Sequence, residues 1–315
     1  MLVLNARLTT QDLSYSVPGL EARKTAGIPA SQIEQKTSLH NVRILIAIAA
    51  FDFSQLPHLE EVLDSYQDLC VAGPSKVDIV IHATVAYPVT LIDLLNSRLV
   101  PSCNDVLAIS VIIVESSLRL HLVDLHRPLF YERINEYDLF VYTEDDIRLG
   151  IRTVAAYLDE TRRIEDKVGT KRASDFNVGV VRYEYNFPSN VVMDDKTRHA
   201  TQNVTRVYWE HSMFPAINKA VDVVPVDEFR KSHVHCKNHH QGMFLATRKL
   251  LLAWKDRLGC NFDQVKNRPG MKNRPSQPSE GTQRVWMSSQ QLYGGSHCNV
   301  QQVGICRYLR YDVPA

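Results

Sequence analysis

The stretch from Arg43 to Phe51 constrains the fold more than any other part of this chain. After the arginine it is a continuous apolar run, Ile-Leu-Ile-Ala-Ile-Ala-Ala-Phe, without the polar–apolar alternation of a half-exposed strand. Such a run is typical of a strand buried on both faces, as in a parallel sheet covered by helices on either side. The chain is therefore predicted to build an α/β fold around this strand.

The segments that follow alternate between helical and strand patterns. Pro57 opens a predicted helix whose apolar residues recur at helical spacing as far as Leu69, and Gly73 closes it. Two further apolar runs, over 77–82 and 106–114, predict the next strands. This order is typical of a Rossmann-like, mostly parallel sheet flanked by helices.

The composition fits a globular protein and argues against two kinds of partner. The 315 residues are 44% hydrophobic and 23% charged, and the formal net charge is +1. A nearly neutral chain has no broad electrostatic footprint for nucleic acid. No apolar run approaches the roughly 18 residues of a membrane-spanning helix. The six cysteines are too few and scattered for a disulfide scaffold, and they fit either redox compartment.

We expect one domain with an irregular second half, preceded by a polar segment. Residues 1–40 are polar and aperiodic and are predicted to form a leader or stem. The Rossmann-like half then spans 41–150, and the second half spans 151–315. The predicted elements of the second half are helices over 151–164 and 243–258, strands over 177–185 and 206–209, and a proline-containing loop over 263–282.

The most informative motif is an acidic triplet at the end of a predicted strand. A short helix over 127–137 leads into an apolar strand over 139–143, which ends in Glu144, Asp145 and Asp146. Adjacent carboxylates repel one another unless water or a cation neutralises them. Hard oxygen ligands suit Mg²⁺ or Mn²⁺, and ligands of such sheets bind beyond the carboxyl ends of the strands. The alternative is a solvated acidic turn.

This order of elements, ending in the triplet, resembles that of the nucleotide-sugar-dependent glycosyltransferases of the GT-A fold over most of the chain. Their motif is Asp-any-Asp, of which Glu144-Asp145-Asp146 is a variant. The resemblance implies that Asp146 is the principal ligand of Mn²⁺ or Mg²⁺. It implies that Glu144 contacts the ribose or the metal through water, and that Asp145 supports the donor sugar or the metal. Residues 41–150 would then bind the nucleotide-sugar and residues 151–315 the acceptor.

The implied reaction transfers a sugar from a UDP- or GDP-sugar to a glycan or glycoprotein acceptor. Breaking the sugar–phosphate bond leaves negative charge on the diphosphate, which a divalent cation stabilises. An inverting reaction also needs a general base. Glu184, at a predicted strand end among aromatic residues, is the candidate base, and an ion pair with Arg182 is its alternative role. Arg284 is a candidate for bidentate contact with a phosphate, the alternative being a surface charge.

A second cluster follows in the later half of the chain. Five potential metal ligands fall within eight residues: His233, His235, Cys236, His239 and His240. Their spacing fits no standard zinc finger. The resemblance implies that His240, or later His297, supplies the protein's third contact to the metal near the reacting sugar, and that Gly242 allows close approach of the backbone. The alternatives are a zinc hydrolase built on residues 233–240 and ordinary hydrogen-bonded histidines.

Two alternatives concern the protein as a whole. Many glycosyltransferases end in a further histidine-containing segment that has no obvious counterpart here, which favours a non-catalytic glycan-binding protein of the same fold as an alternative. Enzymes of this kind face the lumen of the Golgi or the endoplasmic reticulum behind an N-terminal anchor. We expect that location if an anchor is missing from this sequence, and a cytoplasmic one otherwise.

Overall fold

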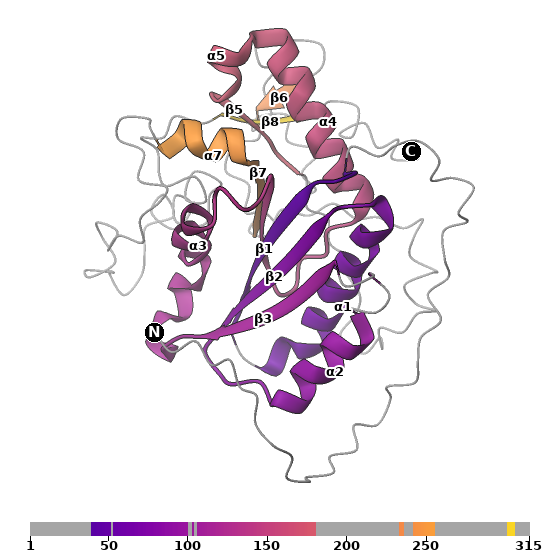
Figure 1. The fold of residues 1–315 in the computed structure, drawn as a ribbon. Helices are drawn as coiled ribbons and strands as arrows, with labels where there is room; N and C mark the ends of the chain where they lie inside the picture. Colours follow the sequence, from indigo (N-terminus) through magenta and orange to yellow (C-terminus); the bar gives the residue numbers. More distant parts are fainter. Residues whose placement is uncertain are drawn as a thin grey trace, which may run out of the picture.

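The computed structural model describes residues 39–51, 53–99, 103, 106–180, 233–235, 242–255 and 301–305. Its strands are β1 (Arg43–Ala50), β2 (Lys76–Ala83), β3 (Leu107–Ile113), β4 (Leu139–Glu144), β5 (Phe176–Val178), β6 (His233–His235), β7 (Met243–Thr247) and β8 (Gln301–Ile305). Within these residues they form a five-stranded sheet in the order β3-β2-β1-β4-β7 and a three-stranded sheet in the order β5-β8-β6 (Figure 1).

Helices cover both faces of the larger sheet. The α-helices are α1 (Leu56–Gln67), α2 (Val89–Leu99), α3 (His126–Glu132), α4 (Ile151–Val168), α5 (Thr170–Ala173) and α7 (Arg248–Lys255), and the 3-10 helices are η2 (Phe53–Gln55), η3 (Asp68–Ala72) and η5 (Ser116–Asp124). Helices α1, α2 and α4 pack on one face, while η5, α3 and α7 pack on the other (Figure 1). The predicted α/β class with a mostly parallel, helix-flanked sheet is confirmed.

The central position of β1 explains why its sequence is apolar throughout. It pairs in parallel with β2 on one side and with β4 on the other, and all its residues from Ile44 to Ala50 are buried. Strand β3 extends the parallel order beyond β2, whereas β7 runs antiparallel to β4 and makes the sheet mixed. A strand enclosed by neighbours and by helices on both faces has no solvent side on which polar residues would be favoured.

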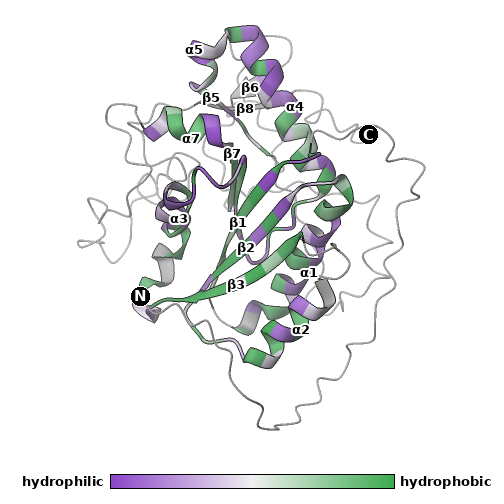
Figure 2. Cartoon of the chain, viewed as in Figure 1, coloured by the Kyte–Doolittle hydropathy of each residue, from purple (hydrophilic) through white to green (hydrophobic). Residues whose placement is uncertain are grey.

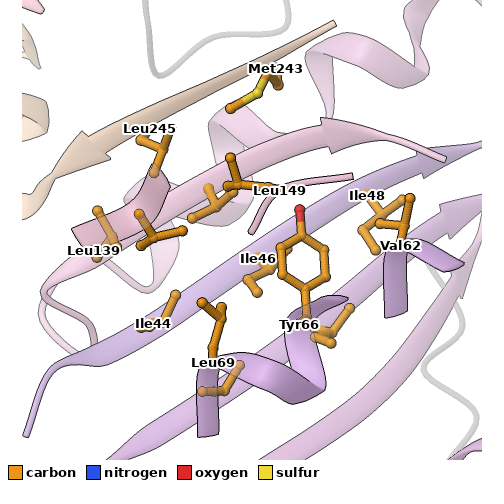
Figure 3. Packing of buried hydrophobic residues seen from close by; sticks show 14 of the residues in the cluster. Ile44, Ile46, Ile48, Val62, Tyr66, Leu69, Leu139, Leu149, Met243 and Leu245 are labelled. Carbon is orange, nitrogen blue, oxygen red and sulfur yellow. The ribbon is translucent and has the colours of Figure 1, made fainter. Parts of the chain in front are cut away.

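The two faces of the sheet contribute to two separate hydrophobic cores. On one face, Tyr66 of α1 reaches the sheet and donates a hydrogen bond from its hydroxyl to Oγ1 of Thr143 (3.0 Å), among leucine and isoleucine side chains (Figure 3). On the other face, Phe130, Phe140 and Phe244 form an aromatic cluster. The strands are mostly apolar along their length, while α1 and α4 carry both apolar and polar residues, as expected of amphipathic helices (Figure 2).

Two predicted elements require correction. The helix predicted over 243–258 is wrong at its start, because Met243–Thr247 is strand β7 and the helix is Arg248–Lys255. A short apolar run satisfies either pattern, and antiparallel pairing with β4 decides it here. The helix predicted over 127–137 ends at Glu132, before a turn. Of the strand predicted over 177–185, the described residues form only Phe176–Val178.

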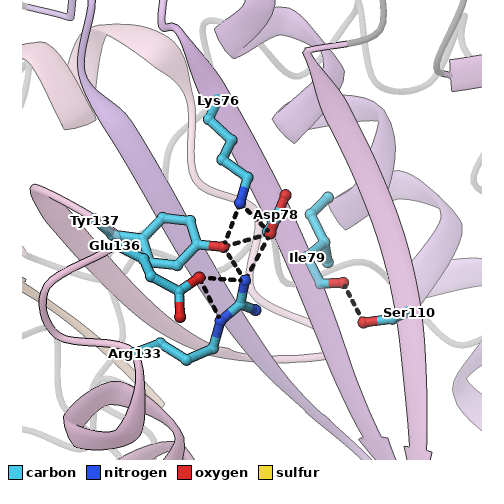
Figure 4. A network of polar contacts seen from close by, with 7 residues as sticks. All are labelled: Lys76, Asp78, Ile79, Ser110, Arg133, Glu136 and Tyr137. Carbon is cyan, nitrogen blue, oxygen red and sulfur yellow. Dashed lines mark hydrogen bonds and ion pairs between the residues drawn. The ribbon is translucent and has the colours of Figure 1, made fainter.

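The amino-terminal edge of the sheet carries a network of charged side chains. The Tyr137 hydroxyl donates to Asp78, and Arg133 and Lys76 form ion pairs with the same carboxylate at 3.0 and 3.2 Å (Figure 4). Burial by itself would raise the pKa of Asp78, but the hydrogen bonds from these three groups lower it below its ordinary value. The network joins β2 to the turn before β4, opposite the edge that carries the acidic triplet.

A disulfide joins Cys70 of η3 to Cys103, with the two Cα atoms 5.3 Å apart. Cys103 lies between α2 and β3, so the bond connects two of the crossovers on one face of the sheet. The spacing of the six cysteines did not indicate this pair. Among the helices that the structure describes, none is long and apolar enough to span a membrane.

Candidate functional site

The acidic triplet lies where the strand order of the sheet reverses. From β1 the chain runs outward through β2 to β3, and it then returns to place β4 on the other side of β1. Ala49 of β1 pairs with Glu144, the last residue of β4, and the N–H of Asp145 donates to the carbonyl oxygen of Ala49 (3.2 Å). In open α/β sheets, ligands bind at this switch point, outside the carboxyl ends of the strands. The triplet therefore lies at the edge where sheets of this kind bind their ligands.

The three carboxylates differ in their exposure to solvent. Asp146 is exposed, Glu144 is half-buried, and Asp145 is only 9% exposed. The N–H of Ile147 donates to the carbonyl oxygen of Glu144 (3.2 Å), so the chain turns sharply after the strand. Because of these differences, Asp146 and Glu144 are the two carboxylates that a ligand arriving from solvent reaches first.

Gly242 brings a second segment of backbone against Glu144. The N–H of Glu144 donates to the carbonyl oxygen of Gly242 (2.9 Å), which continues the pairing of β4 with β7. A Cβ atom at Gly242 would lie 2.8 Å from Oε2 of Glu144 and 2.4 Å from Cδ1 of Ile147, and its φ is +55°. Only glycine combines this conformation with so close an approach. The sequence had pointed to Gly242 for this property, and the structure adds that Glu144 is the residue approached.

A buried tyrosine lies beneath the triplet on β4. Among the atoms that the structure describes, the Tyr142 hydroxyl has no hydrogen-bond partner, and the side chain is 1% exposed. Burial raises the pKa of this hydroxyl well above its ordinary value, and four carboxylates raise it further because their charges oppose a phenolate. These carboxylates belong to Asp124, Glu144, Asp145 and Asp146. Tyr142 is therefore a protonated donor surrounded by acidic groups.

The end of η5 and the start of α3 lie near Tyr142. Asp124 is 1% exposed, and its Oδ1 lies 3.4 Å from a guanidinium nitrogen of Arg127, which is also buried. The ring of His126 packs 4.4 Å from that of Tyr142 and 5.1 Å from that of Phe244, measured between centroids. Helix α3 begins at His126, and the ring of His126 thereby joins the aromatic core.

A histidine lies at the same edge of the sheet, on β2. His82 pairs with Ala49, which in turn pairs with Glu144 on the other side. The side chain of His82 is 5% exposed, and burial lowers its pKa from 6.5 to about 4, so that the imidazole is neutral at pH 7. The sequence interpretation did not identify His82 or Asp124 as site residues. A polar residue near the end of an apolar strand was the one signal available for His82.

Three predicted site residues, Glu184, His240 and Arg284, lie outside the described residues. Of the histidine cluster, only the side chain of His233 is described. Its Nε2 lies 2.7 Å from Oε1 of Glu160 on α4, and both side chains are buried. The hydrogen bond from His233 lowers the pKa of Glu160 below its ordinary value. His233 thereby joins β6 of the smaller sheet to α4.

The carboxylates at the switch point suit a hard divalent cation. Carboxylate oxygens are the ligands that Mg²⁺ and Mn²⁺ prefer, and Gly242 lets the Glu144 carboxylate pack directly against the backbone, since a Cβ there would lie 2.8 Å from its Oε2. Within the described part of the chain, no group of three or more His, Cys, Asp or Glu residues is arranged to hold a metal ion. Mg²⁺ commonly binds through one or two carboxylates, waters and substrate phosphates, so the triplet fits such an ion.

Comparison with known proteins adds no relative to these observations. No protein-family model matches the chain, and no curated protein sequence matches it.

Proposed function

We propose that this protein is a metal-dependent glycosyltransferase that transfers a sugar from a UDP- or GDP-sugar to a glycan or glycoprotein acceptor. The observation that carries the proposal is the position of three consecutive carboxylates, Glu144 to Asp146, at the switch point of a Rossmann-like sheet. Adjacent carboxylates repel one another unless water or a cation neutralises them, and the switch point is where such sheets bind nucleotides.

Asp146 and Glu144 hold Mn²⁺ or Mg²⁺ in this proposal. When bound, the ion stabilises the negative charge that develops on the departing diphosphate. Glu144 is held in place by the pairing of its backbone with Ala49 on one side and Gly242 on the other. Asp145, which is largely enclosed, supports this arrangement or the donor sugar. Because the backbone of Glu144 is fixed on both sides, only its side chain has to adjust when a ligand binds.

The close approach of Gly242 also supports the proposed role of His240. Only one residue separates the two in the sequence, so the covalent chain limits their Cα–Cα distance to about 7.6 Å. Gly242 lies against Glu144, and this nearness in the sequence is what motivates the role. His240 is proposed as the third protein contact of the metal. Glu184 is proposed as the general base, and Arg284 as a contact to the donor phosphates.

The disulfide supports an oxidising location for this activity. Disulfides such as Cys70–Cys103 form in the endoplasmic reticulum and persist in compartments of the secretory pathway, whereas cytosolic thiols are kept reduced. The lumen of the endoplasmic reticulum or Golgi is therefore proposed over the cytoplasm.

Thermal unfolding in the presence of UDP or GDP, with and without Mn²⁺, tests the proposal. A ligand at a hundredfold excess over its dissociation constant stabilises the native state by about 2.7 kcal/mol, and the unfolding midpoint rises accordingly. We expect a rise that requires both the nucleotide and the metal. Asp146→Asn should abolish the rise, while Asp93→Asn, at an exposed position on α2, should preserve it.

Turnover is tested separately by release of the nucleoside diphosphate from a panel of UDP- and GDP-sugars with glycan acceptors. Metal-dependent binding without release of product would favour the non-catalytic glycan-binding alternative. An equal response of the wild type and Asp146→Asn would remove the main support for the site itself.

A further inference from the structure

His82, Ala49 and Glu144 lie in one row across three neighbouring strands. Ala49 is in register with His82 of β2 and with Glu144 of β4. Residues in register on parallel strands point to the same face of a sheet. Two residues earlier, Val80, Ala47 and Tyr142 form the preceding row and share one hydrophobic core, which identifies that face. The row therefore carries an imidazole at one end, a carboxylate at the other and a methyl group between them.

The small side chain of Ala49 separates the two polar residues of this row. Neighbouring strands lie about 4.8 Å apart, so the Cα atoms of His82 and Glu144 are separated by about 9.6 Å. The side chain of Ala49 is a single methyl group, and the residue is 8% exposed at the edge of the sheet. A larger residue at this position would fill the space between the two polar side chains.

The state of His82 indicates which kind of group it can recognise. Within the described part of the chain, the imidazole forms no hydrogen bond or ion pair, although the side chain is more than nine-tenths buried. Burial is the one cause of its lowered pKa, so no charged group acts on the ring appreciably. A neutral imidazole both donates and accepts a hydrogen bond. It therefore suits an uncharged hydroxyl rather than a phosphate.

The ribose is the first uncharged polar unit beyond the phosphates of a nucleotide. In Rossmann-type sheets, a side chain at the end of the second strand commonly contacts the ribose hydroxyls. His82 is the penultimate residue of β2, the second strand. We propose that His82 hydrogen-bonds to a ribose hydroxyl of the nucleotide donor and makes the site selective for ribonucleotides. This inference rests on the proposed function, because it takes the diphosphate to be held at Glu144 and Asp146.

Comparison of ribose with deoxyribose ligands tests this role directly. Binding of UDP, 2′-deoxy-UDP and 3′-deoxy-UDP, and of the corresponding GDP series, is measured by calorimetry with Mn²⁺, and inorganic pyrophosphate serves as the ligand without a nucleoside. We expect the wild type to prefer the ribonucleotide over one of the two deoxy forms by about 3- to 10-fold, as for one neutral hydrogen bond. His82→Phe should weaken binding of the ribonucleotide by the same factor, abolish the preference and leave pyrophosphate binding unchanged.

Further variants separate recognition from folding. His82→Asn retains a polar group of smaller size and serves if His82→Phe does not fold, and it should also lose the preference. His58→Asn, at an exposed position on α1, should behave as the wild type. Ala49→Val places a larger side chain between His82 and Glu144, so it should weaken the binding of the ribonucleotide more than the binding of pyrophosphate.

The possible outcomes distinguish this inference from the proposed function. The role of His82 is overturned if the ribose preference persists in both His82 variants, or if the wild type binds the ribose and deoxyribose forms equally. In either case, metal-dependent binding that is lost in Asp146→Asn still supports the donor site. If the wild type fails to bind both pyrophosphate and nucleoside diphosphates at every metal concentration, the proposed function is overturned, and the inference with it.

Discussion

Replacement of Gly242 by alanine tests how tightly the site is assembled. Two costs add at this position. An L-residue in the left-handed region is disfavoured by about 1–2 kcal/mol, and the φ of Gly242 is +55°. The new Cβ would also lie 2.4 Å from Cδ1 of Ile147, which is only 6% exposed, so the core around it must shift. Overpacking of this kind costs about 1–3 kcal/mol.

The two contacts of the new Cβ have different consequences. Glu144 is half-buried and flexible, so its carboxylate gives way with little loss of stability, whereas Ile147 resists. We expect Gly242→Ala to lower the free energy of unfolding by about 2–5 kcal/mol. Because the Glu144 carboxylate is displaced, the stabilisation by Mn²⁺ with UDP or GDP should also decrease.

Two other glycines provide matched controls. Gly73 has a φ of +76° and ψ of 35°, and its Cβ would meet only an ordinary contact at 3.5 Å, so Gly73→Ala measures the conformational cost alone, about 1–2 kcal/mol. Gly150 has a φ of −84° and open space around it, so Gly150→Ala should cost less than about 1 kcal/mol. Urea unfolding of the three variants provides the comparison. If Gly242→Ala costs no more than Gly73→Ala, the close approach to Glu144 and Ile147 does not constrain the site.

Two further predictions concern stability. Cys103→Ser removes a disulfide whose cysteines are 33 residues apart, and the chain-entropy relation predicts a loss of about 3.7 kcal/mol in urea unfolding. A loss below about 1 kcal/mol, or labelling of Cys70 and Cys103 themselves by a thiol reagent in the unreduced protein, would contradict the bond. The lowered pKa of Glu160 contributes stability that is present above its ordinary pKa of 4.5 and is lost as the pH falls through the lowered value. The difference in unfolding free energy between the wild type and Glu160→Gln should therefore shrink below about pH 4.5, and a difference independent of pH would show that the contact with His233 carries no charge-dependent stability.

The sequence located the acidic triplet without the structure because two local signals coincide there. An apolar run as in residues 139–143 requires burial on both faces, and carboxylates cannot continue such a strand, so Glu144 must lie at its end. The same reasoning correctly placed β1 and β2, since their patterns also depend on burial alone. Met243–Thr247 was misassigned because a five-residue apolar run carries no period that separates strand from helix.

The tertiary structure decided which distant segments meet at this edge. Local sequence does not encode strand order, and only the return of the chain across β1 places β4 between β1 and β7. That order sets Gly242 against Glu144 and His82 in the same row as Ala49. The sequence by itself thus determined the places of β1, β2, β3 and β4, because the burial that their apolar runs require acts residue by residue. The assembly of the candidate site depends on pairings between residues far apart in the chain, which only the folded sheet specifies.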